Sequence, residues 1–131
     1  MPAKPPSPSL WVDASPLEAV AAGLERVSGA MGPMNRNLAP RMKAAIAASA
    51  ELQERSALKS VGLAAAMTSA LIARGVPETT AHLAGELGVL AFKRGFAEWS
   101  DGERDPDREL AHYTLAALRD LRAATASLGD A

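Results

Sequence analysis

Apolar residues recur along the chain at the three-to-four-residue spacing of amphipathic helices. The first helix has a clear start, because Ser15 and Glu18 form the S-x-x-E pattern of a capping box and Pro16 occupies the first helical position. The glycines and the proline of residues 29–33 predict its end. Its apolar face comprises Leu17, Val20, Ala21, Leu24 and Val27.

The same spacing predicts four further helices. Asn37 is the expected cap of the second helix, with Pro40 in its first turn, and the polar Ser49 breaks the pattern before the third helix. Gly75 is expected to end the third helix, and Asp105 to cap the fifth ahead of a proline. The predicted ranges are 38–48, 51–74, 77–99 and 106–126.

The third and fourth predicted helices carry more apolar surface than ordinary surface helices. From residue 60 to residue 73 the third is apolar or uncharged on every side, which is typical of a buried helix, so we expect it at the centre of the domain. The fourth has only a narrow polar strip, formed by His82, Glu86 and Lys93. Such a wide apolar surface exceeds the need of one core, which indicates a partner, most simply a second copy.

Composition places the chain among small all-α proteins of one domain. Residues 1–14 form a Pro-rich extended leader, 15–127 the helical domain and 128–131 a frayed tail. Aromatic residues make up only 4% and alanine supplies much of the apolar content, which favours closely spaced helices. The formal net charge of −1 gives no basic footprint for nucleic acid. The absence of cysteine excludes disulfides and thiolate metal sites.

The lack of a recognisable targeting or membrane-spanning segment favours a cytoplasmic protein that has no contact with a membrane. The first nine residues lack the apolar stretch of a secretory signal. The longest uncharged, mostly apolar run covers residues 60–73, which is shorter than the roughly 20 residues that a membrane-spanning helix needs.

Residues 51–121 resemble the C-terminal domain of TetR-family transcriptional regulators. The resemblance is carried by ELQERSALKSVGLAAAMTSALIARGVPETTAHLAGELGVLAFKRGFAEW, an acidic loop and ELAHYTLAALRDLR. It implies a five-helix orthogonal and antiparallel bundle that binds a small, mostly apolar effector and forms homodimers through its last two long helices. Family members also carry a helix-turn-helix domain of roughly 50 residues at the N-terminus. This sequence has only the Pro-rich leader there, so operator DNA would be contacted only through a domain that it lacks.

The resemblance implies an effector cavity between the first four helices. Thr68, Ser69 and Ser60 are the possible polar anchors on the third helix, although a buried hydroxyl often bonds to its own helix. Each candidate lining residue can also be an ordinary core residue. The candidates are Leu24, Met31, Met42, Ile46, Met67, Thr68, Leu71, Phe92, Phe96 and Trp99.

A row of small residues on the fourth helix is the candidate dimer seam. Small residues let two backbones approach closely, and glycine inside a helix costs about 0.5–1 kcal/mol relative to alanine, so the row needs an offsetting contact. Close packing within one chain is the alternative. The candidate interface comprises Ala84, Leu87, Gly88, Ala91, Gly95, Leu110, Ala117, Leu118 and Leu121.

No catalytic residue, cofactor site or metal site is predicted. His82 and Glu86 share a helix face, but no third ligand accompanies them. Two other functions compete with the effector-binding domain. One is a headless regulator that forms heterodimers with a full-length relative. The other is a small helical enzyme of the chorismate-mutase kind, which the lack of any basic residue between Lys59 and Arg74 disfavours.

Overall fold

The computed structural model describes residues 15–30, 33–100 and 108–129, with residues 33–37 described by their backbone alone. Every regular element in these ranges is an α-helix, which confirms the predicted all-α class. The helices are α2 (Pro16–Gly29), α3 (Pro33–Ala48), α4 (Ala50–Ala73), α5 (Glu78–Ser100) and α6 (Leu110–Leu128). The Pro-rich leader, Met31 and the cap expected at Asp105 lie outside the described residues.

Local capping chemistry fixes three of the helix ends as predicted. The Ser15 side chain accepts a hydrogen bond from the Glu18 backbone, and the Glu18 side chain accepts one from the Ser15 backbone. Ser49 caps α4 by accepting from the Leu52 backbone N–H. Gly75 ends α4 with a φ of 94°, a conformation that glycine adopts without strain.

Two predicted helix starts are wrong. The second helix begins at Pro33, not near residue 38, and Pro40 lies in its interior. Proline suits a first helical turn, and Pro33 takes that place, so Pro40 is accommodated at the loss of one backbone hydrogen bond. The fifth helix begins at Leu110, four residues later than the predicted proline start, because the extended backbone of Glu109 caps it there.

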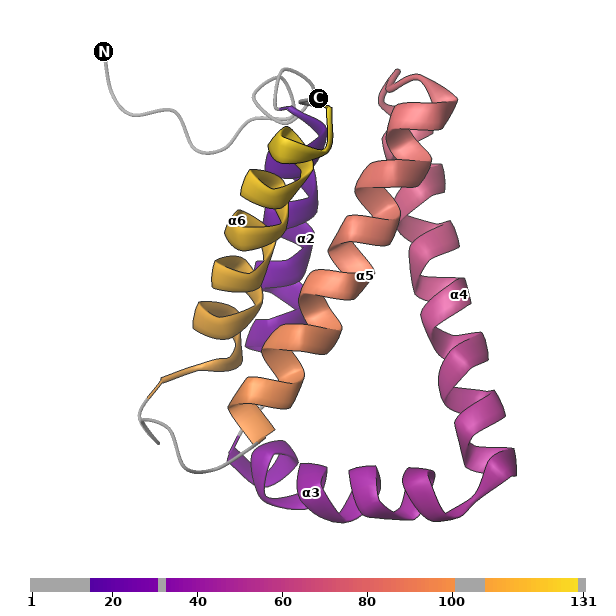
Figure 1. Cartoon of the computed structure of the whole chain (residues 1–131), viewed down its shortest axis with the longest axis vertical. Coiled ribbons are helices and arrows are strands. Elements are labelled where there is room, and N and C mark those ends of the chain that lie inside the picture. The colour runs from indigo at the N-terminus through magenta and orange to yellow at the C-terminus, as the bar shows by residue number, and fades with distance from the viewer. Residues whose placement is uncertain (1–14, 31–32, 101–107, 130–131) are drawn as a thin grey trace.

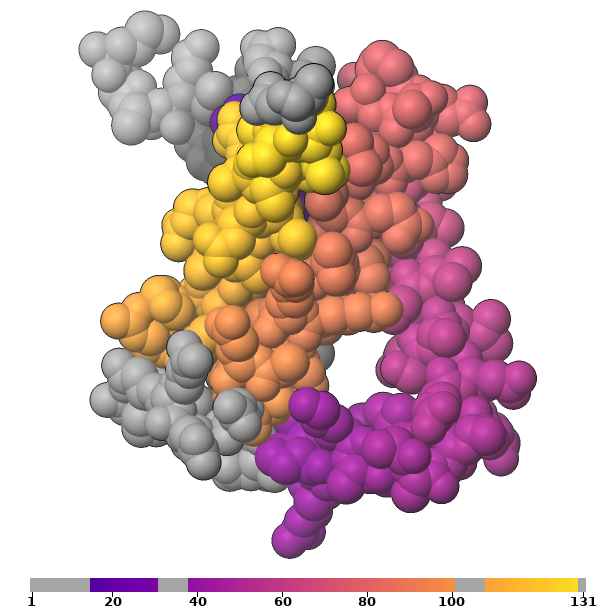
Figure 2. Space-filling view, in the orientation of Figure 1, coloured from indigo at the N-terminus to yellow at the C-terminus, as the bar shows by residue number. Residues whose placement is uncertain are grey.

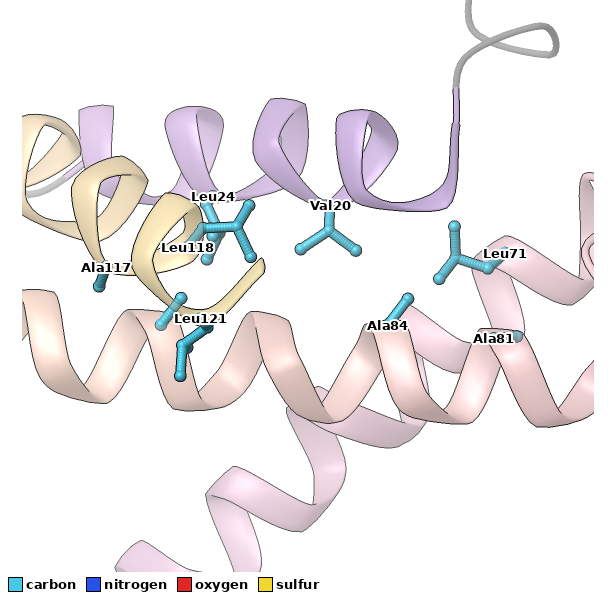
Figure 3. Close-up of a cluster of buried hydrophobic side chains, with 9 residues drawn as sticks. Val20, Leu24, Leu71, Ala81, Ala84, Ala117, Leu118 and Leu121 are labelled. Atoms are coloured by element: carbon cyan, nitrogen blue, oxygen red, sulfur yellow. The ribbon is translucent and has the colours of Figure 1, made fainter. Parts of the chain in front are cut away.

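Helix α5 is the centre of the molecule. It packs against α6 and α4 over long stretches and also against α2, and the four helices share one apolar core (Figure 1). Helix α3 crosses from α2 to the far end of α4, so that α3, α4 and α5 form the three sides of a triangle (Figure 1). The core side chains converge from α2, α4, α5 and α6 (Figure 3). They are Val20, Leu24, Leu71, Ala81, Ala84, Ala91, Ala117, Leu118 and Leu121.

The expected burial of α4 is wrong. Only Ala64, Thr68 and Leu71 of this helix are buried, while the side chains of Leu58 and Val61 are 70% and 65% exposed. The cause is its alanine content: alanine favours helix at exposed positions and adds little apolar bulk, so a lack of charge does not require burial. Of the described helices, α4 alone is long and apolar enough, by length and composition, to cross a membrane.

We predict that Gly95→Ala lowers the free energy of unfolding by about 1–3 kcal/mol. A Cβ atom at Gly95 would lie 2.5 Å from both the N and the Cα of Thr114, so α6 would have to move away from α5. Urea unfolding followed by circular dichroism measures the change. Gly62→Ala is the matched control, because a Cβ on this α4 glycine meets nothing within 4 Å. We expect the control to raise stability by about 0.5–1 kcal/mol. Equal effects of the two substitutions would contradict the close approach.

Candidate functional site

Along one face of α5, the distance between α5 and α4 changes. At Gly85 the two backbones are close: a Cβ there would lie 2.6 Å from Oγ1 of Thr68 and 3.0 Å from the carbonyl oxygen of Ala64. Phe92 and Phe96 follow seven and eleven residues later, so helical periodicity places them on the same face of α5. A small residue is thus succeeded by two large ones, and α4 diverges from α5 along this face (Figure 1).

The divergence leaves an opening between α3, α4 and α5, which the space-filling view shows directly (Figure 2). Phe92 and Phe96 are half-buried on the α5 side that turns toward α4. On α3, Met42 and Ile46 share a helix face with Ala39, which is buried. Met42 is 60% exposed, as expected for a side chain beside open space. The opening therefore has the phenylalanine face of α5 on one side and α3, which carries Met42 and Ile46, on another (Figure 2).

The aromatic residues of the described chain gather at this end of α5. The ring centroids of Phe92 and Phe96 are 5.9 Å apart, and those of Phe96 and Trp99 are 5.6 Å apart with edge-to-face geometry. Trp99 is buried against Leu110 and Tyr113 of α6, and both phenylalanines pack on this cluster. We call Phe92, Phe96, Trp99 and Tyr113 the aromatic cluster. It includes both phenylalanines and the single tyrosine of the chain.

Tyr113 gives the aromatic cluster an unused polar group. Its side chain is 5% exposed, and its hydroxyl is the one buried side-chain polar atom of the described residues without a hydrogen-bond partner. An unsatisfied buried hydroxyl costs about 1–3 kcal/mol. An unpaired hydroxyl of this kind can receive a hydrogen bond from, or donate one to, a bound molecule. The sequence reasoning did not single out Tyr113, because a lone tyrosine on a helix carries no periodic signal.

The polar anchors expected on α4 are occupied or exposed. The Thr68 hydroxyl donates a hydrogen bond to the carbonyl oxygen of Ala64 at 2.8 Å. It therefore bonds to its own helix, which was the alternative to a role as a ligand anchor. Ser69 is exposed, and Ser60 is half-buried. A second buried polar contact joins α2 to α6, where the Ser28 and Thr114 hydroxyls lie 3.1 Å apart.

The structure separates the residues that the sequence assigned to one cavity. Leu24 and Leu71 belong to the central core, and Met67 packs against it. Thr68 is buried between α4 and α5. The described candidates are therefore not brought together around one cavity, because Leu24, Leu71 and Met67 belong to the core or pack against it. Phe92, Phe96 and Trp99 lie together in the aromatic cluster, while Met42 and Ile46 lie on α3.

Two shallow grooves also lie on the described surface. One, of about 260 Å³, runs between the start of α2, the first half of α5 and the end of α6, with Leu83, Leu87 and Arg122 among its lining residues. The other, of about 200 Å³, runs between α2 and α4, with Met67 and Leu71 in its lining and Arg26 and Arg74 also contributing. Both are smaller than the roughly 300–1,000 Å³ of typical ligand pockets.

The small-residue row packs within the chain, which corrects its assignment to a dimer seam. Gly88 faces Met67 of α4 and Val20 of α2, and Gly95 faces Thr114 of α6. Close packing inside one chain, the alternative considered for this row, offsets the cost of its glycines. Leu87 is half-buried, and the other candidates are buried in the chain: Ala84, Gly88, Ala91, Gly95, Leu110, Ala117, Leu118 and Leu121.

His82 and Glu86 are both exposed on α5. No group of three or more potential metal ligands is brought together within the described residues.

Comparison with known proteins identifies no relative. No protein-family model matches the chain, and no curated protein matches it significantly in sequence. The function is therefore inferred from the geometry of the chain itself.

We predict that Tyr113→Phe leaves the free energy of unfolding unchanged or raises it by about 1–3 kcal/mol, because the substitution removes an unpaired hydroxyl. Thr114→Val, at the next position, is the matched control. It removes the partner of Ser28, whose buried hydroxyl would remain unpaired, and we expect a loss of about 1–3 kcal/mol. Urea unfolding measures both. A clear loss of stability in the phenylalanine variant would show that the Tyr113 hydroxyl has a partner.

Proposed function

We propose that this chain is the effector-binding and dimerisation domain of a TetR-like transcriptional regulator. Its effector is a small, mostly apolar molecule that binds in the opening between α3, α4 and α5. The observations that carry the proposal are this opening (Figure 2) and the aromatic cluster at the same end of α5. The order of the helices and the resemblance of residues 51–121 to such domains support it. We place the protein in the cytoplasm, as such a role requires.

The chemistry of the border defines the ligand class. Phe92 and Phe96 offer apolar ring surface, and Met42 offers a flexible thioether that adapts to different shapes. The Tyr113 hydroxyl, packed behind both phenylalanines, supplies one hydrogen bond. Ligand pockets of this kind are mostly apolar with a few polar groups that fix orientation. The expected effector therefore combines an aromatic or alicyclic body with one hydrogen-bonding group.

The same geometry links binding to movement. Helix α4 approaches α5 closely at Gly85 and diverges beyond it, and α3 buries only Ala39 among its described side chains. Elements with few buried contacts change position at low cost. A molecule that contacts α3, α4 and α5 together would favour one angle between α4 and α5. In a regulator that carries DNA-reading domains, this angle would set their spacing on the operator.

The proposal predicts that Phe96→Ala weakens the binding of an apolar probe by about 10–100-fold, which is the loss expected for one buried aromatic contact. The probe is 8-anilinonaphthalene-1-sulfonate, titrated against the folded chain and followed by fluorescence. Leu58→Ala is the control, because this α4 side chain is 70% exposed. Equal affinities in the wild type, the variant and the control would contradict binding beside the aromatic cluster.

A second prediction concerns the polar anchor. Tyr113→Phe keeps the ring in place and removes only the hydroxyl, so we expect about tenfold weaker binding of the same probe without loss of stability. Isothermal titration calorimetry gives the affinity, and thermal unfolding confirms the fold. Unchanged affinity in this variant would remove Tyr113 from the site.

A further inference from the structure

Helix α5 exposes leucines that nothing in the described chain covers. Leu83 and Leu90 are 57% and 42% exposed, and Leu87 is half-buried at the edge of the core. The glycines that touch α2, α4 and α6 lie on the other side of α5. These leucines form the apolar surplus that the sequence predicts for this helix, on a different face from the small-residue row.

The exposed leucines follow the heptad spacing of a helix-pairing seam. Leu83, Leu87 and Leu90 are separated by four and three residues, and Ala97 continues the series seven residues after Leu90. Arg94 takes the one remaining seam position, where its aliphatic stem can cover apolar surface while the guanidinium reaches water. We call Leu83, Leu87, Leu90 and Ala97 the α5 seam. The series covers two heptad spacings, from Leu83 to Leu90 and from Leu90 to Ala97.

The charged residues beside the α5 seam can form ion pairs with the same residues of a second copy. Glu86 and Lys93 are both exposed and lie seven residues apart on the same edge of the seam, the edge away from α6. In an antiparallel pair related by a two-fold axis, the same edge of each helix meets its own copy. An axis that passes beside Leu90 sets Glu86 against Lys93 of the second copy, and the symmetry repeats this ion pair.

One register satisfies the apolar and the charged positions together. The axis that pairs Glu86 with Lys93 also places Leu90 against Leu90 of the second copy and Leu83 against Ala97. On the other edge it brings Glu98 of the second copy toward Arg122, which lines the groove beside Leu83 and Leu87. In a parallel pair the edge that carries Glu86 and Lys93 would meet the opposite edge of the second copy, so these two residues would not pair with each other.

We propose that a second copy of this chain docks its α5 antiparallel along the α5 seam, with reciprocal Glu86–Lys93 ion pairs. The inference rests on the dimeric half of the proposed function and names the surface that forms the dimer. It replaces the small-residue row, which the chain uses internally, with the exposed face of the same helix. Binding of the effector in the opening does not depend on it.

Charge exchange tests the register directly. Glu86→Lys and Lys93→Glu each set like charges against one another twice in the dimer, so we expect each to raise the dissociation constant about tenfold or more. The double variant Glu86→Lys/Lys93→Glu restores both ion pairs and should return the constant to within about threefold of the wild type. Sedimentation equilibrium measures the constants at low salt. In 1 M NaCl the differences should largely disappear, because screening shortens the range of charge interactions.

Two further variants separate the possible failures. Glu54→Lys changes an exposed charge on α4 and should leave the dissociation constant unchanged. Leu90→Lys buries two charges at the axis and should give a monomer that still binds 8-anilinonaphthalene-1-sulfonate. A dimer that survives Leu90→Lys, or single charge variants without effect, would overturn the α5 seam while the dimeric function stands. A wild-type monomer at high protein concentration would overturn both. Loss of probe binding in Phe96→Ala bears only on the effector site.

Discussion

The fold depends on how closely three helices approach the backbone of α5. Gly85 receives α4, Gly88 receives α2 and α4, and Gly95 receives α6, in each case where a Cβ atom would collide. Glycine inside a helix costs about 0.5–1 kcal/mol, so these positions are favourable only because tight packing offsets that cost. At Gly95 the nearest atoms belong to the backbone of Thr114, which makes the spacing of α5 and α6 rigid. The remaining geometry follows from this one helix.

The opening between α3, α4 and α5 lies beyond the glycine at which α4 and α5 are closest. On the face that meets α4, a glycine is followed by two phenylalanines, and α4 diverges from α5 beyond that glycine (Figure 1). Helix α3 spans the resulting gap and closes the triangle (Figure 1). The opening lies where α4 has diverged from α5 (Figure 2). The exposed leucines lie on the other side of α5 from the glycines that receive α2, α4 and α6.

Local signals in the sequence predicted much of the fold. The capping box at Ser15, the break at Ser49 and the end at Gly75 are each signalled by a few neighbouring residues, and all three are confirmed. The start at Pro33 was missed because two prolines compete for the first turn of one helix. Periodicity could not decide between them.

The site was harder to predict because it depends on contacts between helices. An uncharged alanine-rich run gives the same pattern whether it is buried or exposed, and α4 is largely exposed at Leu58 and Val61. The small-residue row required some close contact, but the sequence does not say which helix makes it. Phe92 and Phe96 pack in the aromatic cluster, whereas Leu24 and Leu71 lie in the core.

The central claim is that the chain forms a homodimer and binds a small apolar molecule beside the aromatic cluster. Native mass spectrometry of the protein purified from its own cells tests both parts in one spectrum. The account predicts twice the mass of the subunit, with a small adduct that is released when the protein unfolds. A single subunit without any adduct, at concentrations where helical dimers form, would contradict it.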